Sequence, residues 1–296
     1  MTQQMYEEKF AAYCAQAQTA LEQAAARYLP EESQVCQAAR YSLLGGGKRI
    51  RAVLVLAVSE MLGGDAAAAA SFCAAVEMLH CYSLIHDDLP CMDNDDYRRG
   101  KPSCHKAFDE ATAMLAGDAL LTEAFEVIAD APAAAPVRVR AAAALGKGAG
   151  SRGMVYGQEL DLRFEAGRPT EQQLRLIHRN KTGALINAAV QMGAATALVR
   201  PEVCDVLEQY AYDLGLVFQI VDDVLDVTAT SEQLGKPAGS DAGNGKITFA
   251  SLHGVKGAME LAERLNGENC ARMERAFGQQ AEFLIALAQA LLVRKA

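Results

Sequence analysis

Residues 86–100, HDDLPCMDNDDYRRG, gather five aspartates directly before two arginines. Crowded carboxylates repel one another and stay ionised at neutral pH only where water or a cation screens them. Oxygen-only ligands favour hard cations. Mg²⁺ usually binds one or two carboxylates and completes its shell with water and phosphate oxygens. Arginine side chains also bind phosphate. A calcium loop is excluded because, counted from Asp93, Arg98 stands where glycine is required. The stretch predicts a magnesium site beside an anion, with a solvated acidic loop as the alternative.

A second acidic group lies inside an otherwise apolar stretch, FQIVDDVLDV at 218–227. In a helix Asp222 and Asp226 are i and i+4, and Gln219 lies one turn earlier, so the three side chains project from one face. His80 and Asp87 are seven residues apart and also share a helical face. Carboxylates among apolar residues are costly to bury unless they bind a cation. Two inward-facing acidic helices in a bundle therefore predict metal held between them.

The composition is that of an acidic chain with a large apolar share. Its 296 residues are 51% hydrophobic and carry a formal net charge of −9, which argues against a nucleic-acid surface, so a polyanionic ligand must meet locally gathered cations. The eight cysteines are scattered without C-x-x-C spacing or a preceding secretory leader, which favours reduced thiols. The Ala-rich segment 66–78 is interrupted by Ser71 and Glu77, so no uninterrupted apolar stretch reaches the roughly 18 residues that a membrane span requires. We expect a soluble, cytoplasmic protein.

Apolar residues recur at spacings of three and four between the prolines, which is typical of helices punctuated by proline. Thr170 and Gln173 form a capping box that opens one helix. The sequence lacks alternating β-branched runs joined by hairpin dipeptides, and no fixed-period repeat occurs. Because no linker divides the chain, we predict one all-α domain over residues 1–296. Its helices are expected near 4–28, 32–44, 48–62, 66–88, 108–130, 136–162, 171–198, 203–229, 247–265 and 268–292.

Two glycine-rich stretches resemble nucleotide-binding motifs but lack their settings. GAGSRG at 148–153 follows a helix former rather than a strand, so its glycines are expected to permit close packing. GGGKRIR at 45–51 fails as a P-loop because Arg49 stands where Ser or Thr is needed. What remains is a glycine turn that delivers Lys48 and Arg51 at a helix start, where backbone N–H groups favour an anion.

Five motifs in one order give the sequence a family resemblance. They are GGGKRIRA at 45–52, DD-x4-D at 87–93 followed by RRG, KTG at 181–183, DD-x2-D at 222–226 after FQ, and GNGKIT at 243–248. Together they resemble the bacterial trans-prenyl diphosphate synthases, specifically the short-chain farnesyl diphosphate synthases, over nearly the whole chain. Tyr156 in GMVYGQELD departs from the pattern, because the family more often has a small residue there.

The resemblance implies a bundle of about ten helices around a central cavity, assembled as a homodimer. It implies that an allylic diphosphate, dimethylallyl or geranyl, ionises to a carbocation, which the double bond of isopentenyl diphosphate attacks before a proton is lost. Magnesium, with about three ions per active site and Mn²⁺ as a substitute, is the implied cofactor. No nucleic acid or membrane span is implied.

The resemblance also assigns residues to roles, against the alternative that each cation is an ordinary surface charge or ion pair. The metal ligands are Asp87, Asp93 and Asp222, supported by Asp88, Asp223 and Asp226. Arg98, Lys181 and Lys236 bind the allylic diphosphate, and Thr182 and Gln219 point dipoles at the carbocation. Isopentenyl diphosphate is held by Lys48, Arg51, His80 and Arg99, and Lys246 adds charge near either site.

The resemblance implies that product length depends on Tyr82, with Ser83 beside it. Tyr82 precedes Asp87 by five residues, so its ring lies about 7.5 Å back along the helix at 1.5 Å per residue. An aromatic residue here resembles the floor of short-chain enzymes and implies a C15 product, although an ordinary core tyrosine is the alternative.

Four other functions stay open at this point. A geranylgeranyl diphosphate synthase would share every motif. A class I terpene cyclase would leave GGGKRIR without a second diphosphate to bind, and a silent regulatory subunit would be expected to have lost aspartates that this chain retains. A plain helical interaction module would explain the fold and none of the motifs.

Overall fold

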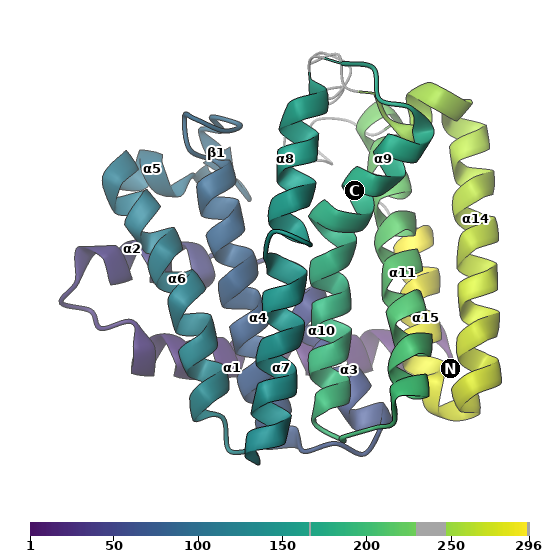
Figure 1. Cartoon of the computed structure of the whole chain (residues 1–296), viewed down its shortest axis with the longest axis horizontal. Coiled ribbons are helices and arrows are strands. Elements are labelled where there is room, and N and C mark those ends of the chain that lie inside the picture. Colours follow the sequence, from purple (N-terminus) through teal and green to yellow (C-terminus); the bar gives the residue numbers. More distant parts are fainter. Residues whose placement is uncertain (166, 229–246, 295–296) are drawn as a thin grey trace. The chain divides into compact units, whose positions relative to one another are not determined.

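The computed structural model describes residues 1–165, 167–228 and 247–294, and these are almost entirely helical. The chain forms two compact units. The N-terminal unit comprises Glu7–Leu145 and Met192–Leu198, and the C-terminal unit comprises Met1–Tyr6, Gly146–Gln191 and Val199–Ala296. The all-α prediction is confirmed (Figure 1), and the single domain stays a prediction. Three helices contribute residues to both units: α1 (Gln3–Tyr28), α7 (Ala135–Ala149) and α10 (Ala184–Ala195).

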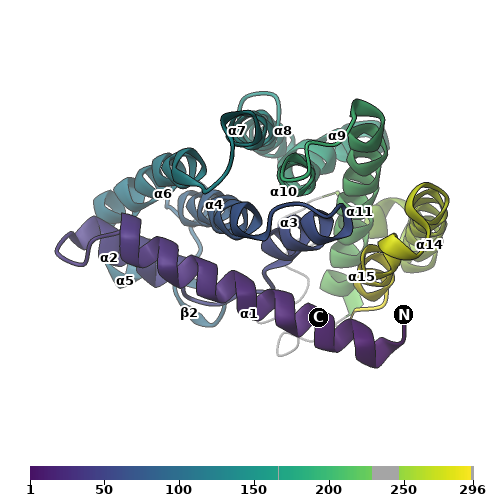
Figure 2. The same ribbon diagram turned by 90° about the horizontal axis from the view of Figure 1, so that it is seen from below.

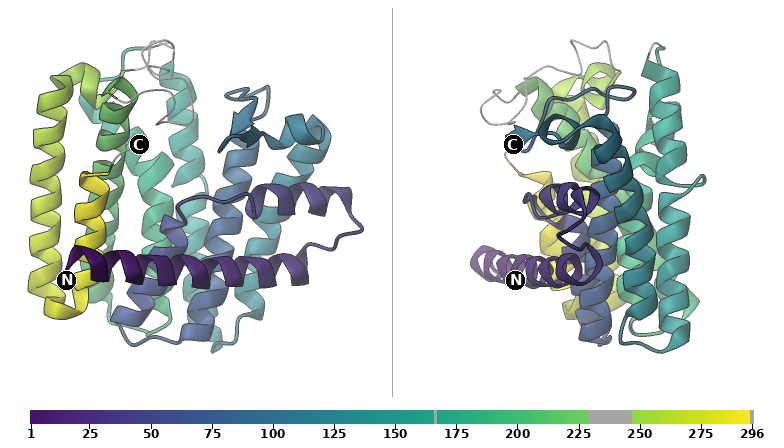
Figure 3. Two further views of the ribbon diagram at one scale, coloured as in Figure 1. Left: turned by 180° about the vertical axis from the view of Figure 1, so that it is seen from behind. Right: turned by 90° about the vertical axis from the view of Figure 1, so that its left-hand side faces the viewer.

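The N-terminal unit is built around α4 (Ala66–Asp87), a helix that is apolar on almost every face. Asp65 caps its start by accepting a hydrogen bond from the Ala68 N–H at 2.8 Å. Helices α3 and α6 pack on either side of α4 (Figure 2), while α2 runs crosswise to it (Figure 3). The other elements of this unit are α2 (Gln34–Leu43), α3 (Ile50–Met61), β1 (Tyr97–Arg98), β2 (Lys101–Pro102), α5 (Cys104–Ala107) and α6 (Glu110–Asp130).

Helix α4 is the one helix among the described residues that is long and apolar enough to cross a membrane. Within its most apolar window, 72% is buried inside the protein, as expected of a core helix. Packing over most of its surface makes α4 a firm support for the residues at its carboxyl end.

The C-terminal unit is built around α11 (Pro201–Thr228) and α14 (Phe249–Phe277), which lie side by side (Figure 1). Val217, Ile220 and Phe249 are fully buried between them. The predicted capping box is confirmed: the Thr170 hydroxyl accepts from the Gln173 N–H at 3.3 Å, and the Gln173 side chain accepts from the Thr170 N–H at 2.8 Å. The other elements are α8 (Met154–Glu165), α9 (Glu171–His178), the π-helix η1 (Arg179–Gly183), the 3₁₀ turn η2 (Gly278–Ala281) and α15 (Glu282–Leu292).

Two expectations about the elements are wrong, and one element was missed. The helix predicted over 136–162 is two helices, α7 and α8, because the chain turns at 150–153. The break predicted near residue 266 comes instead at Gly278, which ends α14 with a φ of 56°. The hairpin of β1 and β2 was not expected, because strands of two residues are too short to show alternation.

Close approach of α10 to α3 yields a prediction about stability. A Cβ on Gly193 would lie 2.6 Å from the Val55 carbonyl oxygen and 2.9 Å from the Val58 Cβ, so backbone must move. We expect Gly193→Ala to lower the free energy of unfolding by about 1–3 kcal/mol through overpacking. Gly267 in α14 has open space where its Cβ would be, so Gly267→Ala should raise stability by about 0.5–1 kcal/mol. Urea unfolding followed by circular dichroism measures both, and a neutral Gly193→Ala would contradict this packing.

Candidate functional site

The first acidic motif lies where α4 ends. Asp87 is the last residue of α4, and the chain turns back so that the Asp93 N–H donates to the Asp87 carbonyl oxygen at 2.9 Å. This turn brings together two residues that the sequence analysis assigned to one metal site. Tyr82 is buried one turn and a half earlier and packs edge-on against His86, with ring centroids 5.6 Å apart. The Ser83 hydroxyl donates to the His80 carbonyl oxygen at 2.8 Å.

Asp88 is buried and holds Arg98. The Arg98 Nε donates to both carboxylate oxygens of Asp88, at 2.9 and 3.0 Å, and its Nη2 also contacts Asp88. Asp95 lies 3.6 Å from the same guanidinium group. Burial raises the pKa of Asp88, and the hydrogen bonds from Arg98 oppose that rise. In this structure Asp88 orients a cation, so its assigned role as a supporting metal ligand stays a prediction.

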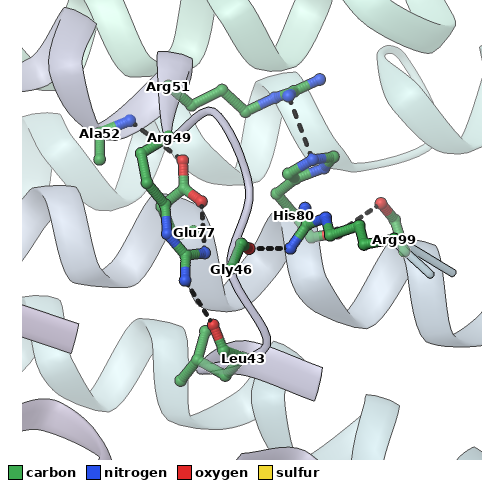
Figure 4. A network of polar contacts seen from close by, with 9 residues as sticks. Leu43, Gly46, Arg49, Arg51, Ala52, Glu77, His80 and Arg99 are labelled. Carbon is green, nitrogen blue, oxygen red and sulfur yellow. Dashed lines mark hydrogen bonds and ion pairs between the residues drawn. The ribbon is translucent and has the colours of Figure 1, made fainter. Parts of the chain in front are cut away.

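The glycine turn at 45–47 makes room for Arg99. Gly46 and Gly47 have φ of 94° and 125°, which side-chain-bearing residues rarely adopt. The Arg99 guanidinium donates to the Gly46 carbonyl oxygen (Figure 4), and a Cβ on Gly47 would lie 2.7 Å from the Arg99 Cζ. A glycine loop therefore lets a guanidinium group from the hairpin lie directly on its backbone.

Arg51 and His80 meet beside this loop, with the Arg51 Nη1 3.2 Å from the His80 Nε2 (Figure 4). Guanidinium only donates, so Nε2 must accept and the imidazole proton is assigned to Nδ1. Burial, Arg51 and Arg99 lower the pKa of His80 well below its usual value, which keeps the ring neutral. Burial lowers the pKa of Arg51 to about 10, with Glu77 opposing and Arg99 adding to the effect. Three of the four residues assigned to isopentenyl diphosphate thus form a cationic cluster, and Lys48 is exposed on the loop.

In the C-terminal unit, Lys181 and Thr182 lie on the π-helix η1, a local widening that is frequent at functional sites. Helix α8 approaches η1 closely, since a Cβ on Gly157 would lie 2.0 Å from the Lys181 backbone nitrogen. One turn further along α8, the Asp161 carboxylate contacts the Lys181 Nζ at 2.6 Å. The backbone contact and the ion pair together fix the direction of Lys181.

A pocket in this unit collects several of the assigned residues. The Thr182 hydroxyl lies 2.5 Å from the Gln219 Oε1, which joins η1 to α11. His178 lines the same pocket and stacks on Phe249 with ring centroids 5.7 Å apart. Burial lowers the pKa of His178 to about 4, so its ring is neutral. The polar lining residues are Asp161, His178, Lys181, Thr182, Gln219, Asp223 and Thr248.

The second acidic motif has one accessible aspartate. The Asp222 side chain is 43% exposed and pairs with the Arg294 guanidinium at 2.5 Å. Asp223 is buried and accepts from the Phe249 N–H at 2.7 Å, which fixes the start of α14. Asp226 is also buried. The predicted residues Lys236 and Lys246 lie outside the described part of the chain.

The aspartates fit a hard cation by their chemistry. Asp87 and Asp93 at one turn, and Asp222 in the other unit, offer only oxygen donors, which suits Mg²⁺. Among the described residues, no three His, Cys, Asp or Glu side chains converge on one point. Each unit by itself therefore supplies part of a ligand shell that Mg²⁺ would complete with water and phosphate oxygens.

Sequence reasoning missed three residues that form ion pairs at or beside these sites: Glu77, Asp161 and Arg294. The sequence did contain a signal for Glu77. It is a lone acid in an apolar helix, three residues before His80, so the two side chains share one face of that helix. The signal for Asp161 was weaker: it lies four residues after Gly157, so both residues are on the same face of α8. Arg294, close to the C-terminus, had none that spacing could show.

Comparisons with known proteins agree with these observations. The family model "Polyprenyl synthetase" matches residues 32–282. A farnesyl diphosphate synthase of Micrococcus luteus is 47% identical over 235 residues, 79% of this chain and 81% of that protein. The chloroplastic geranylgeranyl pyrophosphate synthase 3 of Arabidopsis thaliana is 46% identical over 272 residues, 90% of this chain and 76% of that protein.

A solved structure shows the same fold. The geranyltransferase of Helicobacter pylori complexed with magnesium and isoprenyl diphosphate superposes with a TM-score of 0.83 at 33% identity, covering 96% of this chain and 97% of that chain. The isoprenoid-synthase type of fold is thereby confirmed. With a family model that spans most of the chain and relatives above 40% identity, the chain belongs to the polyprenyl synthetase family of prenyltransferases.

Proposed function

We propose that the protein joins isopentenyl diphosphate head to tail to an allylic diphosphate, releases pyrophosphate, and makes farnesyl diphosphate (C15) as its main product. One observation carries the proposal: Arg51 and Arg99 lie beside His80 in one unit, and Lys181 lines a pocket in the other. A condensation of two diphosphates needs two such sites. A terpene cyclase needs one, and would leave the cluster at the glycine turn without a ligand.

The cluster of Arg51, His80 and Arg99 suits the diphosphate of isopentenyl diphosphate. Two guanidinium groups supply charge-assisted hydrogen bonds to its oxygens. The neutral His80 adds a donor at Nδ1, an atom that has no hydrogen-bond partner among the described residues. Holding this substrate by its charged end leaves its double bond free to reach the carbocation.

The pocket around Lys181 suits the allylic substrate. Lys181 supplies positive charge where the departing pyrophosphate becomes negative, and Asp161 keeps the ammonium group in place. The Thr182 hydroxyl donates to the Gln219 Oε1 at 2.5 Å, and the lone pairs that remain on these two oxygens would face a carbocation. The resemblance also assigns diphosphate binding to Arg98, which Asp88 orients in the N-terminal unit, and to Lys236 and Lys246, which lie outside the described residues.

Asp87, Asp93 and Asp222 would hold Mg²⁺, with Asp88, Asp223 and Asp226 in support. When bound, the ion would neutralise the negative charge that grows on the pyrophosphate as it leaves. Magnesium in the Helicobacter pylori complex supports this cofactor. A count of about three ions and the use of Mn²⁺ belong to the same proposal.

The C15 product rests on Tyr82, a buried ring packed against the turn that precedes Asp87. Relatives of the chain include both a farnesyl and a geranylgeranyl diphosphate synthase, so a geranylgeranyl (C20) synthase is the second candidate. The proposed homodimer is supported by the family resemblance, and the proposed cytoplasmic location by eight cysteines that are scattered without C-x-x-C spacing.

The reaction itself gives the first test of this proposal. Purified protein with isopentenyl and geranyl diphosphates should form a longer prenyl diphosphate with Mg²⁺, stop when EDTA is added, and resume when Mg²⁺ is restored, because metal bridges carboxylate and diphosphate. Radio-chromatography of the products measures this. Full turnover in EDTA would refute the metal site, and a hydrocarbon product would favour the cyclase.

Tyr82 yields a prediction about chain length. Tyr82→Ala removes a buried ring and should let a further C5 unit fit, so the product should shift from C15 to C20 or longer. Tyr82→Phe keeps the ring volume and is the matched control, which should still stop at C15. Chromatography of the dephosphorylated products decides between them. An active Tyr82→Ala enzyme that stops at C15 would show that Tyr82 does not set the length.

A further inference from the structure

Glu77 is an acid in α4, the one described helix that is both long and apolar enough to cross a membrane. It lies in α4 within the run CAAVEMLHC, and only 3% of its surface is exposed. Its partner Arg49 is 7% exposed. Neither residue is among those assigned to a substrate or a metal above.

The Glu77 carboxylate joins two helices directly and a third through Arg49 (Figure 4). Its Oε1 accepts from the Ala52 N–H in the first turn of α3 at 3.2 Å, and its Oε2 lies 3.3 Å from the Arg49 Nη1. The Nη2 of Arg49 donates to the carbonyl oxygen of Leu43, the last residue of α2, at 2.8 Å. The glycine turn between α2 and α3 is thereby tied to α4 at both of its ends.

Two features that oppose folding coincide here. A buried ion pair is often no more stabilising than apolar residues of the same volume, because both charges lose their water. Arg49 also has a φ of 51°, a left-handed conformation that is unfavourable for an arginine. Backbone strain and buried charge at one place are typical of a segment whose conformation is needed for binding or catalysis.

The neighbours of the pair show what that geometry serves. Ala52, bound by Glu77, follows Arg51, and Glu77 lies one helical turn before His80 on α4. One carboxylate thus sets α3, which carries Arg51, against the turn of α4 that carries His80. Gly46, which accepts from Arg99, lies in the loop that Arg49 ties down.

We infer that Glu77 is a positioning residue for the isopentenyl diphosphate site, acting through Arg49 and the start of α3 to hold Arg51 and Arg99 beside His80. It touches no substrate. The inference rests on the proposed function for the identity of the ligand. Glu77 is negatively charged and lies close to a site for an anion. Its charge and its positioning role therefore predict opposite effects on anion binding.

A negative charge beside an anion site weakens anion binding when it acts through its charge alone. If that were the role of Glu77, its neutralisation would strengthen binding. Positioning predicts the opposite sign, because displaced guanidinium groups lose their hydrogen bonds to the diphosphate. Glu77→Gln removes the charge and keeps the size, whereas Glu77→Asp keeps the charge and shortens the side chain.

Calorimetry of isopentenyl diphosphate and of geranyl diphosphate, each titrated separately, tests the inference without turnover. We expect both Glu77→Gln and Glu77→Asp to weaken isopentenyl diphosphate binding about tenfold or more, the scale on which small misplacements act. Geranyl diphosphate should bind as before. Glu60→Gln is the control for the loss of charge, since Glu60 on α3 pairs with Lys9 and Tyr13 away from the cluster.

Circular dichroism establishes that each variant is folded, and Glu77→Asp is the milder change if Glu77→Gln is not. Isopentenyl diphosphate binding that is unchanged or tighter in a folded variant overturns the inference, as does equal weakening for both diphosphates. Wild-type protein that binds both diphosphates without forming product would refute the proposed function and still decide the role of Glu77. Wild-type protein that does not bind isopentenyl diphosphate would overturn both.

Discussion

Holding cations together out of water is the constraint on which both candidate sites depend. Guanidinium and ammonium groups repel one another and lose hydration when they are gathered in a pocket. The structure meets the constraint with carboxylates that are buried or half-buried: Glu77 holds Arg49, Asp88 holds Arg98, and Asp161 holds Lys181. The same acids fix the direction of each charge, so little reorganisation is left for the moment a substrate binds.

The cluster around His80 shows how incomplete this compensation is. Burial, followed by four arginines, lowers the pKa of His80, and burial lowers the pKa of Arg51 with Glu77 opposing and Arg99 adding to the effect. The arginines outnumber Glu77, so positive charge exceeds negative charge there. A bound polyanion would relieve the repulsion. The protein has a net charge of −9, so an anion is attracted by this local excess and not by the whole molecule.

The sequence predicted most of the helices, because proline, capping residues and apolar spacing act over a few neighbouring residues. Thr170 caps its helix as expected, and Gly148 packs close to α10, with a Cβ there 2.7 Å from the Ala184 carbonyl oxygen, in place of binding a nucleotide. The hairpin at 97–102 and the break at Gly278 were missed, since two-residue strands and single glycines carry little periodicity.

Arg51, His80 and Arg99, which the sequence assigned to one substrate, lie close together in the structure. Arg98 and Lys181, assigned to the other substrate, belong to different units, so their shared role stays a prediction. The residues that hold these side chains through hydrogen bonds and ion pairs were not predicted. Glu77, Asp161 and Arg294 act across helices that spacing along the chain cannot pair. Asp88 was read as metal support, yet its carboxylate holds Arg98, a contact set by the turn that follows α4.

The most direct test of the account compares Arg51→Gln with Lys181→Gln by measuring KM for each diphosphate. Removing a charged partner of a bound anion costs about 2–5 kcal/mol, so each variant should raise one KM by tenfold or more. The account predicts that Arg51→Gln acts on isopentenyl diphosphate and Lys181→Gln on geranyl diphosphate. Equal effects of each variant on both substrates would contradict the assignment of separate sites.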